Sequence, residues 1–264
     1  STYDTNEYHP EPRVATIVAS HHAPEWVVAI KETGMVWLVD YSDLDNLSMT
    51  QIATERFLHD GGFDATGRYL LIAANMRDQM VVVDTKDRKF VTKFETGTKP
   101  HPGRGANWDD PKYGPVSATT HLGEGLITVY GSDPKGHPEH AWKVVMEEET
   151  GGPGLFLKTH PKSAYVWTDA TISKEEGANQ QICVFKKADF QAGKQCWKAT
   201  DHGKVVHFEY NKAGDEVWVA VWDQKGELIV YDDKTLKEKH RITGDWLVTP
   251  TGKWNVYNTV HDIY

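Results

Sequence analysis

The chain has 264 residues, of which 39% are hydrophobic and 25% are charged, and these values are ordinary for a globular protein. Its formal net charge of −9 disfavours nucleic acid as a partner, although an acidic surface could receive a basic electron donor. No stretch approaches the ~20 apolar residues needed to cross a bilayer, so we expect no membrane span. No signal peptide is visible at the first residue, and we expect a chain that is either cytosolic or already processed.

The sequence contains two cysteines, Cys183 and Cys196, and neither stands in a CxxC or CxxCH pattern. Covalent attachment of a c-type haem and a cysteine zinc site are therefore not expected. A disulfide between the two cysteines stays open at this point, and we favour two separate thiols on or near strands.

In chain order, nearly every apolar run is short, rich in β-branched or aromatic residues, and bounded by Gly, Asp, Asn or Pro. This pattern is typical of strands separated by turns. No long segment repeats apolar residues every 3.6 positions, so we expect little helix, with Pro138 to Met146 as the best helical candidate. The predicted strands include 26–30, 35–39, 69–73, 80–83, 126–130, 164–167, 182–185, 216–221 and 228–231.

A loose repeat underlies these strands. Similar turns open strand groups at 63–69 (FDATGRY), 160–166 (HPKSAYV) and 210–218 (YNKAGDEVW), and nearly identical turns follow at 84–87 (DTKD) and 233–236 (DKTL). A period of roughly 45–50 residues with about four strands per unit is typical of propeller blades. We therefore predict an all-β propeller of four to five such antiparallel units. A β-sandwich is the alternative, and the regular spacing of like units argues against it.

Two glycine-containing segments, which we interpret as loops, each carry a histidine: 58–62 (LHDGG) and 100–107 (PHPGRGAN). Glycine allows positive φ and a close approach of the backbone to a ligand, and histidine exchanges a proton near neutral pH. Arg104 offers a planar fork of donors for carboxylates. The set suits a bound anionic cofactor with a small anion reduced above it, and two ordinary turns are the alternative.

With these segments in view, the chain resembles the haem d1 domain of the cytochrome cd1 nitrite reductases. The resemblance implies an eight-bladed propeller that carries non-covalent haem d1 on its axis and reduces nitrite to nitric oxide in the periplasm. Besides the two histidine segments it rests on motifs along the whole chain: 8–14 (YHPEPRV), 31–34 (KETG), 114–116 (GPV), 131–138 (GSDPKGHP), 158–161 (KTHP), 232–236 (DDKTL), 249–253 (TPTGK) and 255–259 (NVYNT).

The resemblance also implies that residues 1–264 are part of a single haem d1-binding propeller domain, roughly the second half of its ring. The first blades, which in the family supply the proximal iron ligand, and the cytochrome c domain with its haem c are expected outside this chain, so no metal ligand is assigned here. Segment 254–259 is expected to pair with a blade that does not precede it. The expected partners are nitrite, nitric oxide, the remaining half of the propeller, an electron-donating cytochrome c or cupredoxin, and a second copy of the full-length enzyme.

His59 and His101 match the family's distal histidine pair, so the resemblance assigns to them proton donation and anchoring of the nitrite anion. The alternative for either one is a buried histidine with structural bonds. The resemblance places Arg104 at the haem rim, with Gly103 and Gly105 permitting the close approach, and a solvent-facing turn arginine is the alternative.

Four further positions are cofactor-binding candidates by the same resemblance. Thr251 and Gly252 match a family segment near the haem. Phe156 and Trp218 are candidate walls for the macrocycle, with plain core packing as their alternative. In addition, His207 stands where we expect a glutamine in the reductases. It would add a third titrating group if it faced the pore, but we favour a strand histidine that faces solvent.

Two other functions stay open. Related propellers act in making haem d1, as a dehydrogenase of its propionate side chain or as a carrier. A propeller of the WD40 kind would instead be a non-enzymatic interaction module. Because haem d1 absorbs strongly in the red, a visible spectrum separates the haem d1 functions from the last one.

Overall fold

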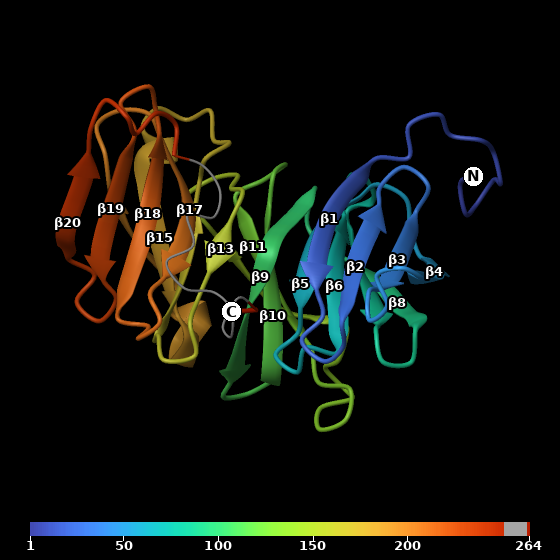
Figure 1. Ribbon diagram of the computed structural model, residues 1–264. Helices are drawn as coiled ribbons and strands as arrows, with labels where there is room; N and C mark the ends of the chain where they lie inside the picture. Colours follow the sequence, from blue (N-terminus) through green and yellow to red (C-terminus); the bar gives the residue numbers. More distant parts are fainter. Residues whose placement is uncertain (251–262) are drawn as a thin grey trace.

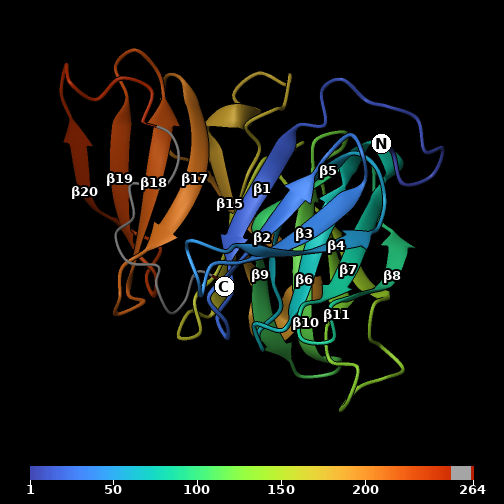
Figure 2. The same ribbon diagram turned by 45° about the vertical axis from the view of Figure 1, so that its right-hand side comes forward.

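The computed structural model describes residues 1–250 and 263–264, which form five four-stranded antiparallel sheets. The sheets follow one another along the chain, with the β1–β4 sheet at one end and the sheet that ends in β20 at the other (Figures 1 and 2). The first strands of consecutive sheets contact one another, which is the arrangement of propeller blades around a common axis. These strands are β1 (Val14–Ala19), β5 (Leu58–Phe63), β9 (Pro100–Asp110), β13 (Leu157–Lys158) and β17 (Lys204–Tyr210). The predicted all-β propeller architecture is confirmed.

The other strands complete the five sheets and include the runs predicted from the sequence, except that β14 begins one residue after the predicted start at 164. In the first two sheets they are β2 (Glu25–Ile30), β3 (Met35–Asp40), β4 (Ser48–Ala53), β6 (Tyr69–Ala74), β7 (Gln79–Asp84) and β8 (Lys89–Glu95). In the third and fourth they are β10 (Gly114–His121), β11 (Leu126–Gly131), β12 (Val144–Glu149), β14 (Tyr165–Asp169), β15 (Gln181–Lys186) and β16 (Lys194–Lys198). In the fifth they are β18 (Glu216–Trp222), β19 (Glu227–Asp232) and β20 (Glu238–Thr243).

Helix within the described residues is limited to three short 3-10 segments, η1 (Asn75–Arg77), η2 (Ala178–Gln180) and η3 (Lys187–Ala192). None of the helices in the described part of the chain is long and apolar enough to cross a membrane. The prediction of a helix from Pro138 to Met146 is wrong, since this segment is a turn that leads into β12. Trp142 there adopts a left-handed φ of 59°, which a right-handed helix cannot contain.

The hydrophobic core lies between neighbouring sheets. Alternate residues of the strands point to opposite faces, so each sheet contributes to the layer on either side of it. Val27 and Ile72, from the first two sheets, belong to one buried cluster, and Trp167 and Ile229, from the last two, belong to another. This packing fixes the sheets relative to one another and so positions the inner strands.

Cys183 and Cys196 form a disulfide, so the expectation of two separate thiols is wrong. The two residues lie directly opposite each other in the antiparallel β15–β16 pair, with their Cα atoms 4.2 Å apart. Directly opposed residues in such a pair are close enough for a disulfide. The register of the two strands, which the spacing of the cysteines did not reveal, therefore determines the pairing.

The last two residues of the chain lie against the inner strands. Asn107 of β9 donates from its side-chain amide to the carbonyl oxygens of Phe63 in β5 and of Ile263. The backbone N–H of Thr159 donates to the Tyr264 carbonyl oxygen at 2.9 Å. These contacts tie the chain end to the third and fourth sheets, while the expected pairing of segment 254–259 lies outside the described residues.

Candidate functional site on the inner strands

The two histidine segments lie in strands β5 and β9, and the expectation that they are loops is wrong. Both strands contain an irregularity of register: His59 and Asp60 fall between two regular stretches of β5, and residues 102–105 fall between two regular stretches of β9. Bulges of this kind turn side chains out of the regular alternation and are common beside active sites. The glycines therefore serve the bulges, with left-handed φ values of 58° at Gly103 and 77° at Gly105.

The bulges bring His59 and His101 onto one carboxylate. Asp60 has one oxygen 3.2 Å from Nδ1 of His59 and the other 2.9 Å from Nε2 of His101. The two imidazole rings lie 5.1 Å apart between centroids. His101 is buried, whereas His59 is half-buried and reachable by solvent. The structure thus confirms that the predicted pair lies together, and it adds Asp60 as the group that joins them.

The second nitrogen of His101 is also occupied. Its Nδ1 lies 2.6 Å from the carbonyl oxygen of Leu155, which precedes β13. Burial by itself would lower the pKa of His101, but the contact with Asp60 outweighs it and raises that pKa above the ordinary value. Burial would likewise raise the pKa of Asp60, but His101 and His59 hold it well below its ordinary value. His101 and Asp60 therefore each stabilise the charged form of the other.

An aromatic wall continues from the histidine pair to the last sheet. Phe156 meets the His101 ring edge-on at 5.4 Å and stacks on His207 at 3.9 Å between centroids. His207 occupies the bulge of β17 with a φ of 55° and meets Trp222 at 6.1 Å. The expectation that His207 faces solvent is wrong, because the bulge turns its ring onto Phe156. A Cβ on Gly103 would lie 2.7 Å from the Phe156 ring, so only glycine leaves room there.

Arg104 reaches across the inner strands. Its guanidinium donates to the hydroxyl of Thr16 and the carbonyl oxygen of Ile17 in β1, both at 3.1 Å, and to the Gly61 carbonyl oxygen in β5 at 3.3 Å. A solvent-facing turn arginine is therefore not what the structure contains. These bonds hold three inner strands together beside the histidine pair, and the assignment of Arg104 to the haem rim stays a prediction.

Trp218, another predicted position, lies outside this cluster. The indole Nε1 of Trp218 is 3.4 Å from a carboxylate oxygen of Glu216, whose other oxygen pairs with Lys239 of the outer strand β20. Among the described contacts, none joins Trp218 to the wall of Phe156 and His207. Thr251 and Gly252 lie outside the described residues, so their assignments stay predictions.

Sequence reasoning missed Asp60, Leu155 and Trp222. Asp60 stands inside the quoted segment 58–62 next to His59, and that adjacency is the signal that could have marked it. The Leu155 carbonyl contributes only its backbone, so no residue type could have revealed it. Trp222 is one of ten tryptophans, and only the fold distinguishes it from Trp218.

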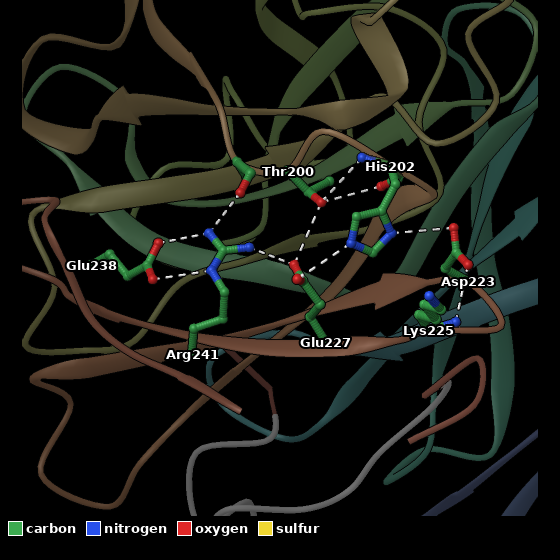
Figure 3. A network of polar contacts seen from close by, with 8 residues as sticks. Thr200, His202, Asp223, Lys225, Glu227, Glu238 and Arg241 are labelled. Atoms are coloured by element: carbon green, nitrogen blue, oxygen red, sulfur yellow. Dashed lines mark hydrogen bonds and ion pairs between the residues drawn. The ribbon is translucent and has the colours of Figure 1, made fainter. Parts of the chain in front are cut away.

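A separate polar network lies at the end of the last sheet (Figure 3). His202 has Asp223 3.2 Å from its Nδ1 and Glu227 3.3 Å from its Nε2, and Arg241 bonds Glu227 and Glu238. A cavity of about 790 Å³ lies elsewhere, between the turns of the first three sheets. Neither this network nor this cavity includes His59 and His101. We therefore place the candidate site on the inner strands, where the histidine pair lies.

Comparison with curated proteins finds relatives that match almost the whole chain. The chain is 48% identical over 276 aligned residues, 98% of its length, to a nitrite reductase of Stutzerimonas stutzeri, of which the match covers 49%. It is 28% identical over 94% of its length to a dihydro-heme d1 dehydrogenase of Pseudomonas aeruginosa, of which the match covers 47%. The chain thus spans about half the length of the curated relatives it matches.

Solved structures show the same fold. A dihydro-heme d1 dehydrogenase in complex with DHE superposes with a TM-score of 0.77 at 26% identity, over 94% of this chain and 50% of that one. A hydrazine synthase of Kuenenia stuttgartiensis, at 12% identity and a TM-score of 0.67, shares the fold alone over 92% of this chain and 69% of that one. Residues 1–259 match the family described as cytochrome D1 heme domain, and the chain belongs to this family.

Proposed function

We propose that this chain is part of the haem d1 domain of a nitrite reductase. This enzyme converts nitrite, one electron and two protons to nitric oxide and water. The observation that carries the proposal is the convergence of His59 and His101 on the inner strands of a cytochrome D1 heme domain. Support also comes from the nitrite reductase relative at 48% identity. Two histidine side chains, each of a residue type that can exchange a proton, match the two protons of this reaction.

The residues present fit an anionic macrocycle. The imidazolium of His101 and the guanidinium of Arg104 place positive charge at the inner strands, and Phe156 offers an aromatic surface. The buried indole Nε1 of Trp222 has no hydrogen-bond partner among the described residues, so it is available as a donor to a cofactor oxygen. Haem d1, when bound, would supply the electron and the iron that holds the nitrite nitrogen.

The chain's own residues would supply protons and positive charge. Both ring nitrogens of His101 face an acceptor, Nδ1 the Leu155 carbonyl oxygen and Nε2 the Asp60 carboxylate, so the Nε2 proton would reach nitrite by leaving its contact with Asp60. His59, which is more exposed, would supply the second proton and regain it from solvent. A cationic His101 would also favour a small anion over neutral ligands, because a fixed positive charge stabilises a negative charge beside it.

The setting of the complete enzyme follows from the same proposal. We infer a periplasmic protein, since the disulfide of Cys183 and Cys196 is typical of an oxidising compartment. The proximal iron ligand, the remaining blades and the haem c domain would lie outside these 264 residues. A cytochrome c or cupredoxin would donate electrons, and the full-length enzyme would be a homodimer.

The second candidate is a dehydrogenase that completes the haem d1 side chain, and the shared fold with a dihydro-heme d1 dehydrogenase favours it. The test is to load the full-length protein with haem d1 and assay two reactions: nitric oxide formation from nitrite, and oxidation of dihydro-haem d1. We expect the first reaction only. Oxidation of dihydro-haem d1 without nitrite turnover would assign the second function, and a colourless protein that binds no haem d1 would leave an interaction module.

A further inference from the structure

His101 has a hydrogen-bond acceptor at each ring nitrogen. The Leu155 carbonyl oxygen at Nδ1 can only accept, so that nitrogen carries a proton. The Asp60 oxygen at Nε2, 2.9 Å away, also accepts when the carboxylate is ionised. A ring with acceptors on both sides is satisfied only when both nitrogens carry protons. The geometry thus requires the imidazolium, provided that Asp60 is an anion.

Asp60 is held as an anion by its surroundings. Its second oxygen faces His59, so each oxygen has a histidine nitrogen within 3.2 Å. Those contacts outweigh the effect of burial and keep the pKa of Asp60 below its ordinary value. A protonated Asp60 would leave the His101 cation without its negative partner, and removing one partner of a buried charge pair is strongly destabilising.

We propose that Asp60 is a positioning residue that keeps His101 as an imidazolium and orients its Nε2 proton, and so determines the pH range over which the site can donate that proton. The inference rests on the proposed function for its consequence in catalysis, but the protonation state of His101 is a property of this chain by itself. Asp60 does not touch the reacting atoms in this assignment; it acts through His101.

Charged and titratable groups from the neighbouring elements face the same histidine. Asp169 of β14 accepts the backbone N–H groups of Leu155 at 2.7 Å and Phe156 at 3.1 Å, and burial raises the pKa of Asp169 to about 6. Above that pH its charge also favours the imidazolium. His207 lies behind Phe156 on the side of β17. Asp60 is the carboxylate in direct contact with the His101 ring.

The guanidinium of Arg104, from the same bulge of β9, contacts the Gly61 carbonyl next to Asp60. It is a fixed positive charge that disfavours a second one nearby. The histidine cation therefore depends on the carboxylate at Asp60, and a change that removes only the charge of Asp60 should be felt at His101.

The experiment measures the ring nitrogen-15 shifts of His101 in the isotope-labelled chain, assigned by the signal lost in His101→Gln. In wild type at about pH 7.5, one unit above the ordinary histidine value, both nitrogens should give imidazolium shifts. In Asp60→Asn, which keeps the shape and removes the charge, His101 should titrate at lower pH. Asp60→Glu should restore part of the lost shift in the titration of His101. Asp109 is an exposed carboxylate on β9, the strand of His101, and Asp109→Asn should leave that titration unchanged.

Neutral shifts for wild-type His101 at that pH would overturn the proposal. An unchanged titration of His101 in a folded Asp60→Asn chain would overturn it as well. In the haem-loaded full-length protein, Asp60→Asn should lower nitrite turnover at pH 7.5 by on the order of tenfold and move the activity profile to lower pH. If wild type shows the imidazolium but no nitrite turnover, the proposed function fails and the role of Asp60 stands.

Discussion

Replacing Gly62 with alanine tests how closely the two histidine strands must approach. Gly62 lies in β5, two residues after Asp60, and a Cβ there would overlap the backbone carbonyl of Arg104 in β9. Gly62 is not among the glycines with positive φ, so alanine meets no backbone strain and the whole effect is steric. Because the obstacle is backbone, the two strands must separate, and His59 and His101 must move with them.

The magnitude follows from that overlap. Inserting a methyl group into a packed interior costs about 1–3 kcal/mol, and the upper half of this range applies where the neighbour cannot rotate away. For a domain of this size each kcal/mol lowers the melting temperature by roughly 2–4 °C, so Gly62→Ala should melt roughly 4–12 °C below wild type. Nitrite turnover per bound haem d1 should fall with it, since misplacement by about 1 Å costs up to 10²-fold.

Gly177→Ala is the matched control. Gly177 has a φ of 74°, but no atom lies within 4 Å of the point that a Cβ there would occupy, so alanine brings backbone strain of about 1–2 kcal/mol and no overlap. It should lower the melting temperature and leave turnover per haem unchanged. A Gly62→Ala protein with wild-type melting temperature and turnover would refute the close approach of β5 and β9 that positions the site.

Three further predictions concern the site, the disulfide and the last sheet. His101→Ala should cut nitrite turnover about 10²-fold or more with haem d1 retained, whereas Arg104→Ala should lower haem d1 occupancy; turnover per haem and the red absorbance separate the two. Reduction of the Cys183–Cys196 disulfide, which joins residues 13 apart, should cost about 2–4 kcal/mol in urea unfolding, and an unchanged midpoint would contradict this. Carboxylates raise the pKa of His202, so its contribution to folding stability is present at pH 5.5 and is lost as the pH rises through the pKa that His202 has in the folded protein. His202→Gln should therefore lower the melting temperature slightly at pH 5.5 but not at pH 9.

The sequence predicts the sheets well because strand periodicity and turn chemistry are local. The runs at 69–73 and 80–83, for example, lie within β6 and β7. It predicts less well where neighbouring strands decide the outcome. Glycines in segments 58–62 and 100–107 indicated loops, whereas pairing with β6 and β10 makes them bulged strands.

The histidine pair could be proposed from the sequence because its segments resemble those of the haem d1 domain family. The protonation state of His101 could not be predicted in this way. Asp60, the Leu155 carbonyl and the contact of His207 with Phe156 depend on how three sheets meet. The same holds for the cysteines, which only the register of β15 and β16 brings together. Long-range packing, which no local pattern encodes, supplies these features.

The most direct test of the account is the amount of nitric oxide formed from nitrite per bound haem d1, in the full-length protein and its His59→Ala/His101→Ala variant. Both proteins should bind haem d1, as the red absorbance reports, because we expect neither histidine to be the main anchor of the cofactor. The account predicts nitric oxide formation by wild type and a loss of at least about 10²-fold in the variant. Equal turnover per haem in the two proteins would contradict the assignment of the histidine pair as proton donors.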